Sequence, residues 1–242
     1  MKLAIVVGAM LSIVQATNRQ LSQDVIGKFR QVAGKYSNST ALGGSELADV
    51  RKNATGLIGN FHHDIILIKE DFMLDAILQE SRMHFQIANQ PFTVDRTCLS
   101  FLNTSLEMDI NLAGVGFTNC ISRVDELFND FKNQFYNRIG AQDALMGELR
   151  ILDVFRGENV FYTPQNIIAK LDLKWEALDS VPESVSSSSR QALINLKVGL
   201  EGLRTAYIEC MTNSEQLLRR SIDLLRMQLS DMCLGESIII PE

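Results

Sequence analysis

The amino-acid sequence predicts an all-α fold: an elongated helical bundle with two long antiparallel helices joined by two disulfides. Two observations support this fold class. Apolar residues recur every three or four positions over long stretches, which is the spacing of an amphipathic helix. Only four prolines occur, at Pro91, Pro164, Pro182 and Pro241, and each coincides with a break in that spacing. We therefore expect the prolines to separate helices.

The first 16 residues have the organisation of a secretory signal peptide. Lys2 provides a positive charge, an apolar run extends from Leu3 to Val14, and small residues precede an expected cleavage after Ala16. The run of about 12 residues is shorter than the ~20 that a membrane-spanning helix requires. We expect a secreted, extracellular protein without a membrane span.

The chain after this segment divides into three parts: an N-terminal helical region over 17–91, a disulfide-linked helical domain over 92–235 and a tail over 236–242. In the first part we expect helices over 24–35 and 45–87, with a turn at Gly43 and Gly44 between them. The tail contains the apolar run Ile238–Ile240, to which the sequence assigns no role.

Two seams of apolar residues predict the long helices of the disulfide-linked domain. The first advances by three or four residues at each step over 99–135 and includes Leu127, and Gly140 is the expected end of its helix. The second extends over 193–232 and includes Leu217, with steps of three or four residues except for one step of five after Leu217. Both patterns are typical of helices that pack along a coiled-coil-like seam.

Two shorter amphipathic segments are expected between the long helices. One spans 145–155, and the other begins with Thr163 as its N-cap and Pro164 in the first helical position. Pro182 and the serines over 184–189 then interrupt the helical pattern. The second long helix follows this interruption.

Four cysteines in an exported chain can pair in three ways. Cys98 and Cys120 lie 22 residues apart on one predicted helix, and Cys210 and Cys233 lie 23 residues apart on another. At ~1.5 Å per residue these separations are about 33 to 35 Å, well beyond the ~4.4 to 6.8 Å between Cα atoms that a disulfide allows. Pairing within one helix is therefore excluded if both helices are continuous.

Two pairings between the helices remain. The antiparallel one joins Cys98 to Cys233 and Cys120 to Cys210, and the parallel one joins Cys98 to Cys210 and Cys120 to Cys233. Cys120 and Cys210 occupy seam positions, whereas Cys98 and Cys233 each lie one residue beside the seam. The antiparallel pairing joins seam to seam and flank to flank, so we favour it and keep the parallel pairing as the alternative.

Three N-glycosylation sequons begin at Asn38, Asn53 and Asn103. Such triplets can be modified only in a chain that enters the secretory pathway. We expect Asn38 to lie in an exposed loop, because Ser37–Thr40 precedes two glycines. Asn103 is the least favoured of the three, since it falls inside a helix that we expect to be packed.

No catalytic or cofactor-binding signature occurs in the sequence, so we expect neither an enzyme nor a bound cofactor. The nearest approach to a metal site is His62, His63 and Asp64, with His84 as the remaining histidine. Adjacent residues on a helix point about 100° apart, so His62 and His63 cannot both face one ion. We expect these histidines to have a solvated or boundary role and no metal to be bound.

Two glycine pairs lie within predicted helices. Gly114 with Gly116 and Gly199 with Gly202 do not follow a strand, so neither forms a phosphate-binding loop. We expect these glycines to allow close packing between helices, at some cost in helix propensity.

Three cysteine-containing motifs carry a family resemblance: Thr97–Leu99, Phe117–Cys120 and Ala206–Cys210, with Cys233 beyond them. Together with the signal peptide and the helical pattern they resemble the TsetseEP-domain family of secreted insect proteins, over about 98–233. Residues 17–91 would then be an additional helical region, and the segment over about 140–189 would be an insertion. The resemblance implies an extracellular protein of gut, haemolymph, saliva or reproductive tract, without established catalytic residues.

The formal net charge of −6 argues against a nucleic-acid partner, because duplex phosphates would repel this chain. We expect a secreted, non-enzymatic helical protein that binds an extracellular protein or surface, with a homo-oligomer as one form. The alternative is an extracellular carrier of a lipid or other apolar ligand. A carrier would require a hollow interior lined by Phe61, Phe72, Phe117, Phe131 and Leu203.

Overall fold

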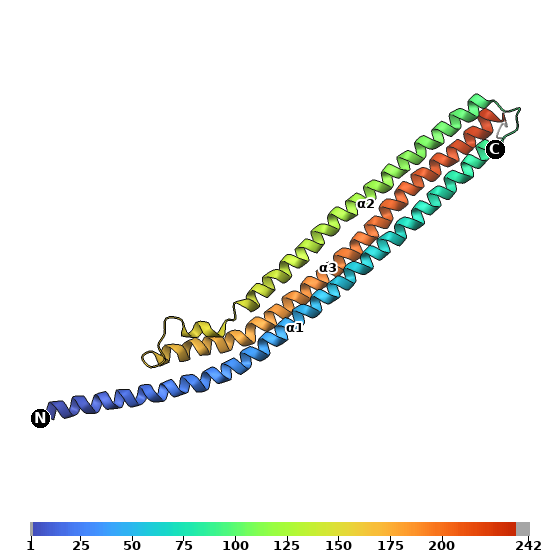
Figure 1. The fold of residues 1–242 in the computed structure, drawn as a ribbon. Coiled ribbons are helices and arrows are strands. Elements are labelled where there is room, and N and C mark those ends of the chain that lie inside the picture. The colour runs from blue at the N-terminus through green and yellow to red at the C-terminus, as the bar shows by residue number, and fades with distance from the viewer. Residues whose placement is uncertain (1, 236–242) are drawn as a thin grey trace, which may run out of the picture. The chain divides into compact units, whose positions relative to one another are not determined.

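The computed structural model describes the backbone of residues 2–235 and the side chains of residues 19–235, so the run Ile238–Ile240 lies outside the described residues. The elements in chain order are α1 over Lys2–Ala88, α2 over Arg96–Gly147, a 3₁₀-helix η1 over Ile151–Phe155, α3 over Pro164–Gln228 and a π-helix η2 over Leu229–Cys233 (Figure 1). The residues described include no strand. The all-α prediction is confirmed.

The structure has three long helices where the sequence predicted two, because α1 is continuous. The turn predicted at Gly43 and Gly44 is wrong, and the helices predicted over 24–35 and 45–87 are parts of α1. A glycine inside a helix costs only about 1 kcal/mol relative to alanine. Gly43 also makes room for the side chain of Met146 on α2, with which a Cβ atom at this position would collide.

The chain forms two compact units, and each unit contains stretches of all three helices. Unit 1 contains residues up to 54 together with 134–195. Unit 2 contains 55–133 together with residues from 196 onward. Both units therefore include residues from either side of the boundary predicted at residue 91, because helices that pack together are far apart in the sequence.

The core of unit 1 joins α1 and α3 through η1. Its buried aliphatic side chains are Val25 and Val32 of α1, Leu149 and Val154 of the segment around η1, and Ile167, Leu171 and Leu178 of α3. The helix predicted over 145–155 is wrong in its second half, where α2 ends and η1 forms. Residues five positions apart on an α-helix point about 140° apart, so the break in the helix between Gly147 and Ile151 allows Leu149 and Val154 to enter one core.

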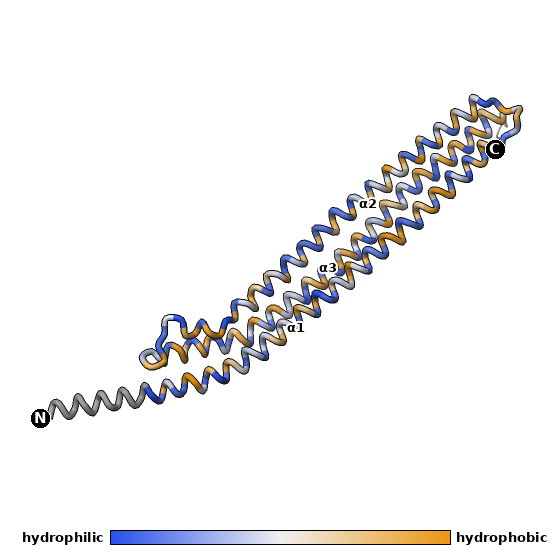
Figure 2. The backbone as a smooth tube through the Cα atoms, viewed as in Figure 1, coloured by the Kyte–Doolittle hydropathy of each residue, from blue (hydrophilic) through white to orange (hydrophobic). Residues whose placement is uncertain are grey.

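In unit 2 the three helices lie side by side, and their contacts follow a fixed order (Figure 1). Between α2 and α3, Gly116 faces Ser214 and Phe131 faces Gly199, so the contacts descend α3 as they ascend α2. Between α1 and α2, the aromatic rings of Phe61 and Phe128 stack with their centroids 5.4 Å apart. Apolar residues recur along all three helices, as Figure 2 shows.

Four of the five ion pairs between described residues of α1 and α3 share one sequence separation. In unit 1 the pairs Lys28 with Asp172 and Glu46 with Arg190 are each 144 residues apart. In unit 2 the pair Asp75 with Arg219 has the same separation. Within unit 1, the equal separation means that α1 and α3 run in the same direction and keep one register. Surface ion pairs contribute little energy each, so we assign to these pairs a role in register rather than in stability.

A proline lies inside α3, and a serine of α1 compensates for it. The predicted break at Pro182 is wrong, since α3 continues through this residue. Pro182 has no backbone N–H to donate to the carbonyl oxygen of Leu178, one helical turn earlier. The Ser39 hydroxyl on α1 donates to that oxygen at 3.1 Å. The hydrogen bond that the proline removes from α3 is thus replaced by one between two helices of unit 1.

We predict that Ser39 and Pro182 are energetically coupled. Ser39→Ala should lower the free energy of unfolding by about 1 kcal/mol, because it leaves the buried side of the Leu178 carbonyl without its donor. In a Pro182→Ala background, where the backbone N–H returns, the same change should cost clearly less. Urea unfolding of the four chains of this double-mutant cycle measures the coupling. Equal costs in both backgrounds would contradict the compensation.

Candidate interaction surface and the disulfide-linked core

Two disulfides join α2 to α3 and η2 within unit 2. Cys98 is bonded to Cys233 and Cys120 to Cys210, with Cα atoms 5.7 and 5.8 Å apart. These are the pairs of the antiparallel alternative that the sequence favoured. The described chain contains no free cysteine. The two helices are therefore covalently held at two levels, one near the start of α2 and one about six turns further along it.

Two of the four predicted packing glycines lie at close contacts. A Cβ atom at Gly116 would lie 2.9 Å from the Ser214 hydroxyl oxygen, and one at Gly199 would lie 2.6 Å from the Phe131 ring. Gly114 and Gly202 have no such neighbour within 4 Å, so the prediction for these two is wrong. Close packing between α2 and α3 thus requires a glycine only at the positions that face the other helix.

The seams predicted for α2 and α3 change phase along each helix. On α2 the buried residue is Phe128 instead of Leu127, and on α3 it is Leu218 instead of Leu217. A seam that alternates steps of three and four residues has a period of 3.5, whereas an α-helix has 3.6 residues per turn, so the buried line drifts towards the next residue. The Leu217 side chain therefore lies at the surface, where it is 65% exposed.

A shallow groove between α2 and α3 lies beside this leucine. It has a volume of about 50 Å³ and is lined by Asp109, Leu112, Ala113, Gly116, Ser214, Leu217, Leu218 and Ser221. Its floor is formed largely by small side chains, so that both backbones are near the surface. Leu112, which is 70% exposed, and Leu217 stand on its two sides.

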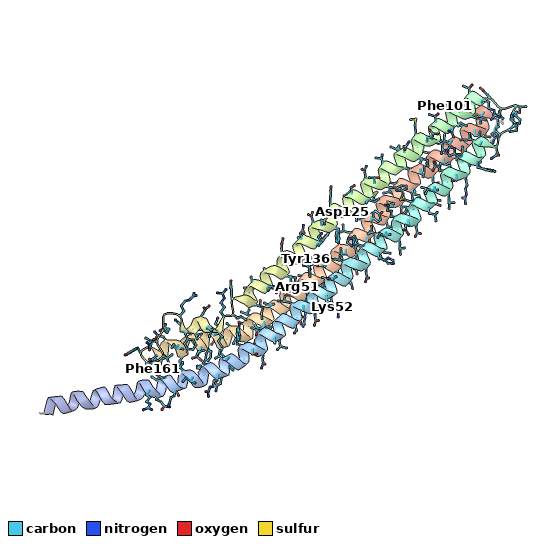
Figure 3. All side chains as sticks on the ribbon, in the orientation of Figure 1. Arg51, Lys52, Phe101, Asp125, Tyr136 and Phe161 are labelled. Carbon is cyan, nitrogen blue, oxygen red and sulfur yellow. A yellow bond between two sulfur atoms is a disulfide. The ribbon has the colours of Figure 1, made fainter. Side chains whose placement is uncertain are left out.

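Further exposed apolar residues extend the sides of this groove. Met108 precedes Leu112 by one turn on α2, and Leu224 follows Leu217 by two turns on α3, so each continues its side of the groove. Phe101 lies two turns before Met108, near the start of α2 (Figure 3). We call these five residues the α2–α3 apolar face. Contiguous apolar surface of this kind is typical of interaction sites.

The uncovered side of α1 in unit 2 carries a second apolar surface. Seven large side chains there are 42 to 69% exposed: Ile66, Leu67, Met73, Leu74, Ile77, Leu78 and Phe85. We call this set the α1 stripe. The sequence pattern did not predict this surface, although adjacent apolar pairs such as Met73 with Leu74 supply more apolar residues than one buried face requires. The positions of the other helices determine which residue of each adjacent apolar pair is exposed, and the sequence of α1 alone does not contain this information.

A larger cavity lies beside the Cys120–Cys210 disulfide. Its volume is about 320 Å³, and it is lined by Cys120, Arg123, Val124, Leu127, Leu203, Ala206, Glu209, Cys210 and Asn213. Of the five residues expected to line a carrier's interior, only Leu203 contributes to this cavity. Phe61 is instead stacked on Phe128, and Phe131 packs over Gly199. The predicted hollow is therefore not formed by that set of side chains.

Tyr207 lies at the centre of the unit 2 core. Its side chain is fully buried, and its hydroxyl has no hydrogen-bond partner among the described residues. Burial raises the pKa of the Tyr207 phenol, because the phenolate would lose its hydration. The residue therefore fills the core as a neutral ring.

The residues of the conceivable metal site are separated by their contacts. The His62 ring tilts against Phe128, with centroids 4.6 Å apart, while Asp64 pairs with Arg204 at 3.0 Å. His84 lies 4.0 Å from a glutamate on its own helix, Glu80. Within the described part of the chain, no group of three or more His, Cys, Asp or Glu side chains could hold a metal ion.

All three sequon asparagines lie in helices. Asn38 and Asn53 are exposed on α1, so the loop predicted for Asn38 is wrong, for the same reason as the turn at Gly43 and Gly44. Asn103 is half-buried on α2 and donates from its amide to Glu107 at 3.1 Å. The predicted cleavage after Ala16 falls outside the described side chains.

In comparisons with known proteins, no family model, no curated protein and no solved structure matches the chain. Among the described residues, no helix combines the length and the apolar character needed to cross a membrane. The geometry of unit 2 is therefore the basis for the functional conclusion.

The disulfide between Cys120 and Cys210 is expected to stabilise the fold strongly. Replacing both residues by serine opens a 90-residue loop in the unfolded chain, so the free energy of unfolding should fall by up to about 4 to 5 kcal/mol. Denaturant unfolding measures the loss, and Cys98→Ser with Cys233→Ser should give a similar one. Peptide mapping without reduction that found Cys98 joined to Cys210 would contradict this connectivity.

Tyr207 is expected to make the fold sensitive to alkaline pH. Because the pKa of Tyr207 is raised in the folded chain, its contribution to stability should be constant below the ordinary value of 10.0 and should be lost as the pH rises above that value. Tyr207→Phe removes this dependence and, since the hydroxyl has no partner among the described residues, should cost little stability at neutral pH. Unfolding curves at neutral and alkaline pH test both points, and identical alkaline losses in the two chains would contradict the assignment.

Proposed function

We propose that this chain is a secreted, non-enzymatic helical protein that acts by binding another extracellular protein through the α2–α3 apolar face. The observation that carries this proposal is the exposure of Leu112 and Leu217 on the two sides of a groove with a floor of small side chains. Monomeric proteins seldom leave such side chains adjacent and uncovered without a binding role.

The shape of the groove favours an amphipathic helix as the bound element. Small residues such as Gly116 and Ser214 allow a ridge of the partner's side chains to approach both backbones, with Leu112 and Leu217 packing at its sides. Asp109 also lines the groove, and the whole chain has a net charge of −6. Both features favour a partner with basic residues beside its apolar ridge.

Several features support the extracellular setting. The two disulfides suit an oxidising compartment, and the amino-terminal residues have the pattern of a signal peptide. An antiparallel arrangement of α2 against α3, held at both disulfides, would present the α2–α3 apolar face as a rigid surface. We also keep the relation to the TsetseEP-domain family, supported by the cysteine motifs, as part of this proposal. Amino-terminal sequencing of protein released by eukaryotic cells should then begin at Thr17.

The binding role predicts that charge in the groove abolishes recognition. Leu112→Glu with Leu217→Glu should weaken binding of a synthetic helix with leucines on one face and flanking lysines at least about tenfold, because carboxylates would be desolvated under the apolar ridge. Both leucines are exposed, so the fold should be retained. Fluorescence anisotropy of the labelled peptide measures the affinity.

The matched control is Leu74→Glu, an equally drastic change on the α1 stripe, which should leave peptide affinity unchanged. Failure of the unaltered chain to bind the peptide, or equal affinity in the groove variant, would overturn the proposed site. Binding to neutral phospholipid vesicles in place of the peptide would instead indicate that a lipid surface is the target.

The second candidate function is that of a carrier, and the cavity of about 320 Å³ beside the Cys120–Cys210 disulfide favours it. Pockets for small ligands begin at about 300 Å³, and this one combines apolar Leu127 and Leu203 with polar Arg123 and Glu209. Native mass spectrometry of protein from its own tissue separates the two functions. A copurified lipid would support the carrier, and its absence would count against it.

A further inference from the structure

The apolar residues of the α1 stripe are arranged almost symmetrically about the midpoint of the stripe. Its midpoint falls between Asp75 and Ala76, and large apolar side chains lie at matching distances on either side of it. Leu74 corresponds to Ile77 in this way, Met73 corresponds to Leu78, and Ile66 corresponds to Phe85. A surface with such symmetry is complementary to a second copy of itself turned end to end.

The charges that flank the stripe follow this symmetry to within two residues, and they have opposite signs on either side of the midpoint. On one edge, Lys69 lies before the midpoint and Glu80 after it. On the other edge, Asp71 lies before the midpoint and Arg82 after it. Asp71 and Arg82 are exposed and form no ion pair with any described residue. In an antiparallel pair of α1 helices, like edges meet, so each basic residue would face an acidic residue of the other copy.

The stripe can meet such a copy although two of its members, Met73 and Ile77, also line a pocket of about 130 Å³ with residues of α2, because these two side chains remain 42% and 52% exposed. Phe61 and Met83 are buried in the core of unit 2, and Asp75 is turned towards Arg219 of α3. The stripe itself spans about 20 residues, or roughly 30 Å of helix, which is a sufficient length for several turns of side-chain packing.

We propose that the α1 stripe is a dimerisation surface, at which two copies of this chain pack antiparallel about a two-fold axis near Asp75 and Ala76. A two-fold interface requires a self-complementary patch, and the apolar and charged residues of the stripe meet that requirement. This site lies on a different helix from the α2–α3 apolar face. It therefore stands independently of the proposed function.

The central polar residues of the stripe select the antiparallel arrangement. Glu70 lies among the apolar residues, and Ser81 is its counterpart across the midpoint. A parallel dimer would place the two Glu70 carboxylates against each other in a dry interface, which is unfavourable. An antiparallel dimer places each Glu70 opposite a Ser81 hydroxyl, which can donate a hydrogen bond to the carboxylate.

Sedimentation analysis of the full mature chain tests the proposal. The unaltered chain should have twice the mass of one copy, and Leu74→Glu with Leu78→Glu should give a single copy of unchanged helical content by circular dichroism. Leu112→Glu, which alters an exposed leucine of α2, is the matched control and should remain a dimer. A single copy at every concentration of the unaltered chain would overturn the proposal, as would a dimer that persists in the stripe variant.

A charge exchange tests the orientation without altering any apolar residue. Asp71→Arg alone and Arg82→Asp alone should each raise the dimer dissociation constant several-fold. Each single change places two like charges opposite each other, one at position 71 and one at position 82 of the other copy. The two changes together should restore the original constant, since the facing pair is re-formed with its signs exchanged. In a parallel dimer Asp71 would face Lys69, so the double variant would dissociate more readily than either single variant, and that result would overturn the antiparallel arrangement.

Discussion

The two disulfides between α2 and the end of α3 fix the register on which the packing of unit 2 depends. The two cysteines on α2 are 22 residues apart, and their partners on α3 and η2 are 23 residues apart. Both bonds can therefore form only when the two helices are aligned in one register. A slip of one turn would separate the bonded Cα atoms by an additional ~5 Å, beyond what a disulfide allows. In this register Gly116 faces Ser214 and Gly199 faces Phe131, where larger residues would collide.

The same register explains why unit 2 has apolar residues on its surface. Two helices of 3.6 residues per turn cannot keep a 3.5-residue seam buried over many turns unless they supercoil fully. On α3 the buried line moves from the predicted Leu217 to Leu218, and Leu217 remains at the edge of the groove. The α2–α3 apolar face is thus a geometric result of long helices held at two points.

The helical class and the cysteine pairing were accessible from the sequence, because both depend on spacing within single helices. The continuity of α1 and α3 was not. Gly43 and Pro182 disfavour helix locally, and their effects are offset by Met146 on α2 and Ser39 on α1, which are distant in the sequence. Exposure of the α1 stripe was equally hidden, since it depends on the positions of the other two helices. The pairing of Asp64 with Arg204 was not predicted either, because it too joins two helices that are distant in the sequence.

The separation of 144 residues between paired positions of α1 and α3 has a consequence for biosynthesis. Translation at about 5 to 20 residues per second leaves each turn of α1 waiting roughly 7 to 30 s before its partner on α3 exists. During this interval the apolar residues of α1 that pack on α3 have no partner to cover them. The nascent chain thus depends on chaperones of its folding compartment for longer than a bundle with neighbouring helix pairs would.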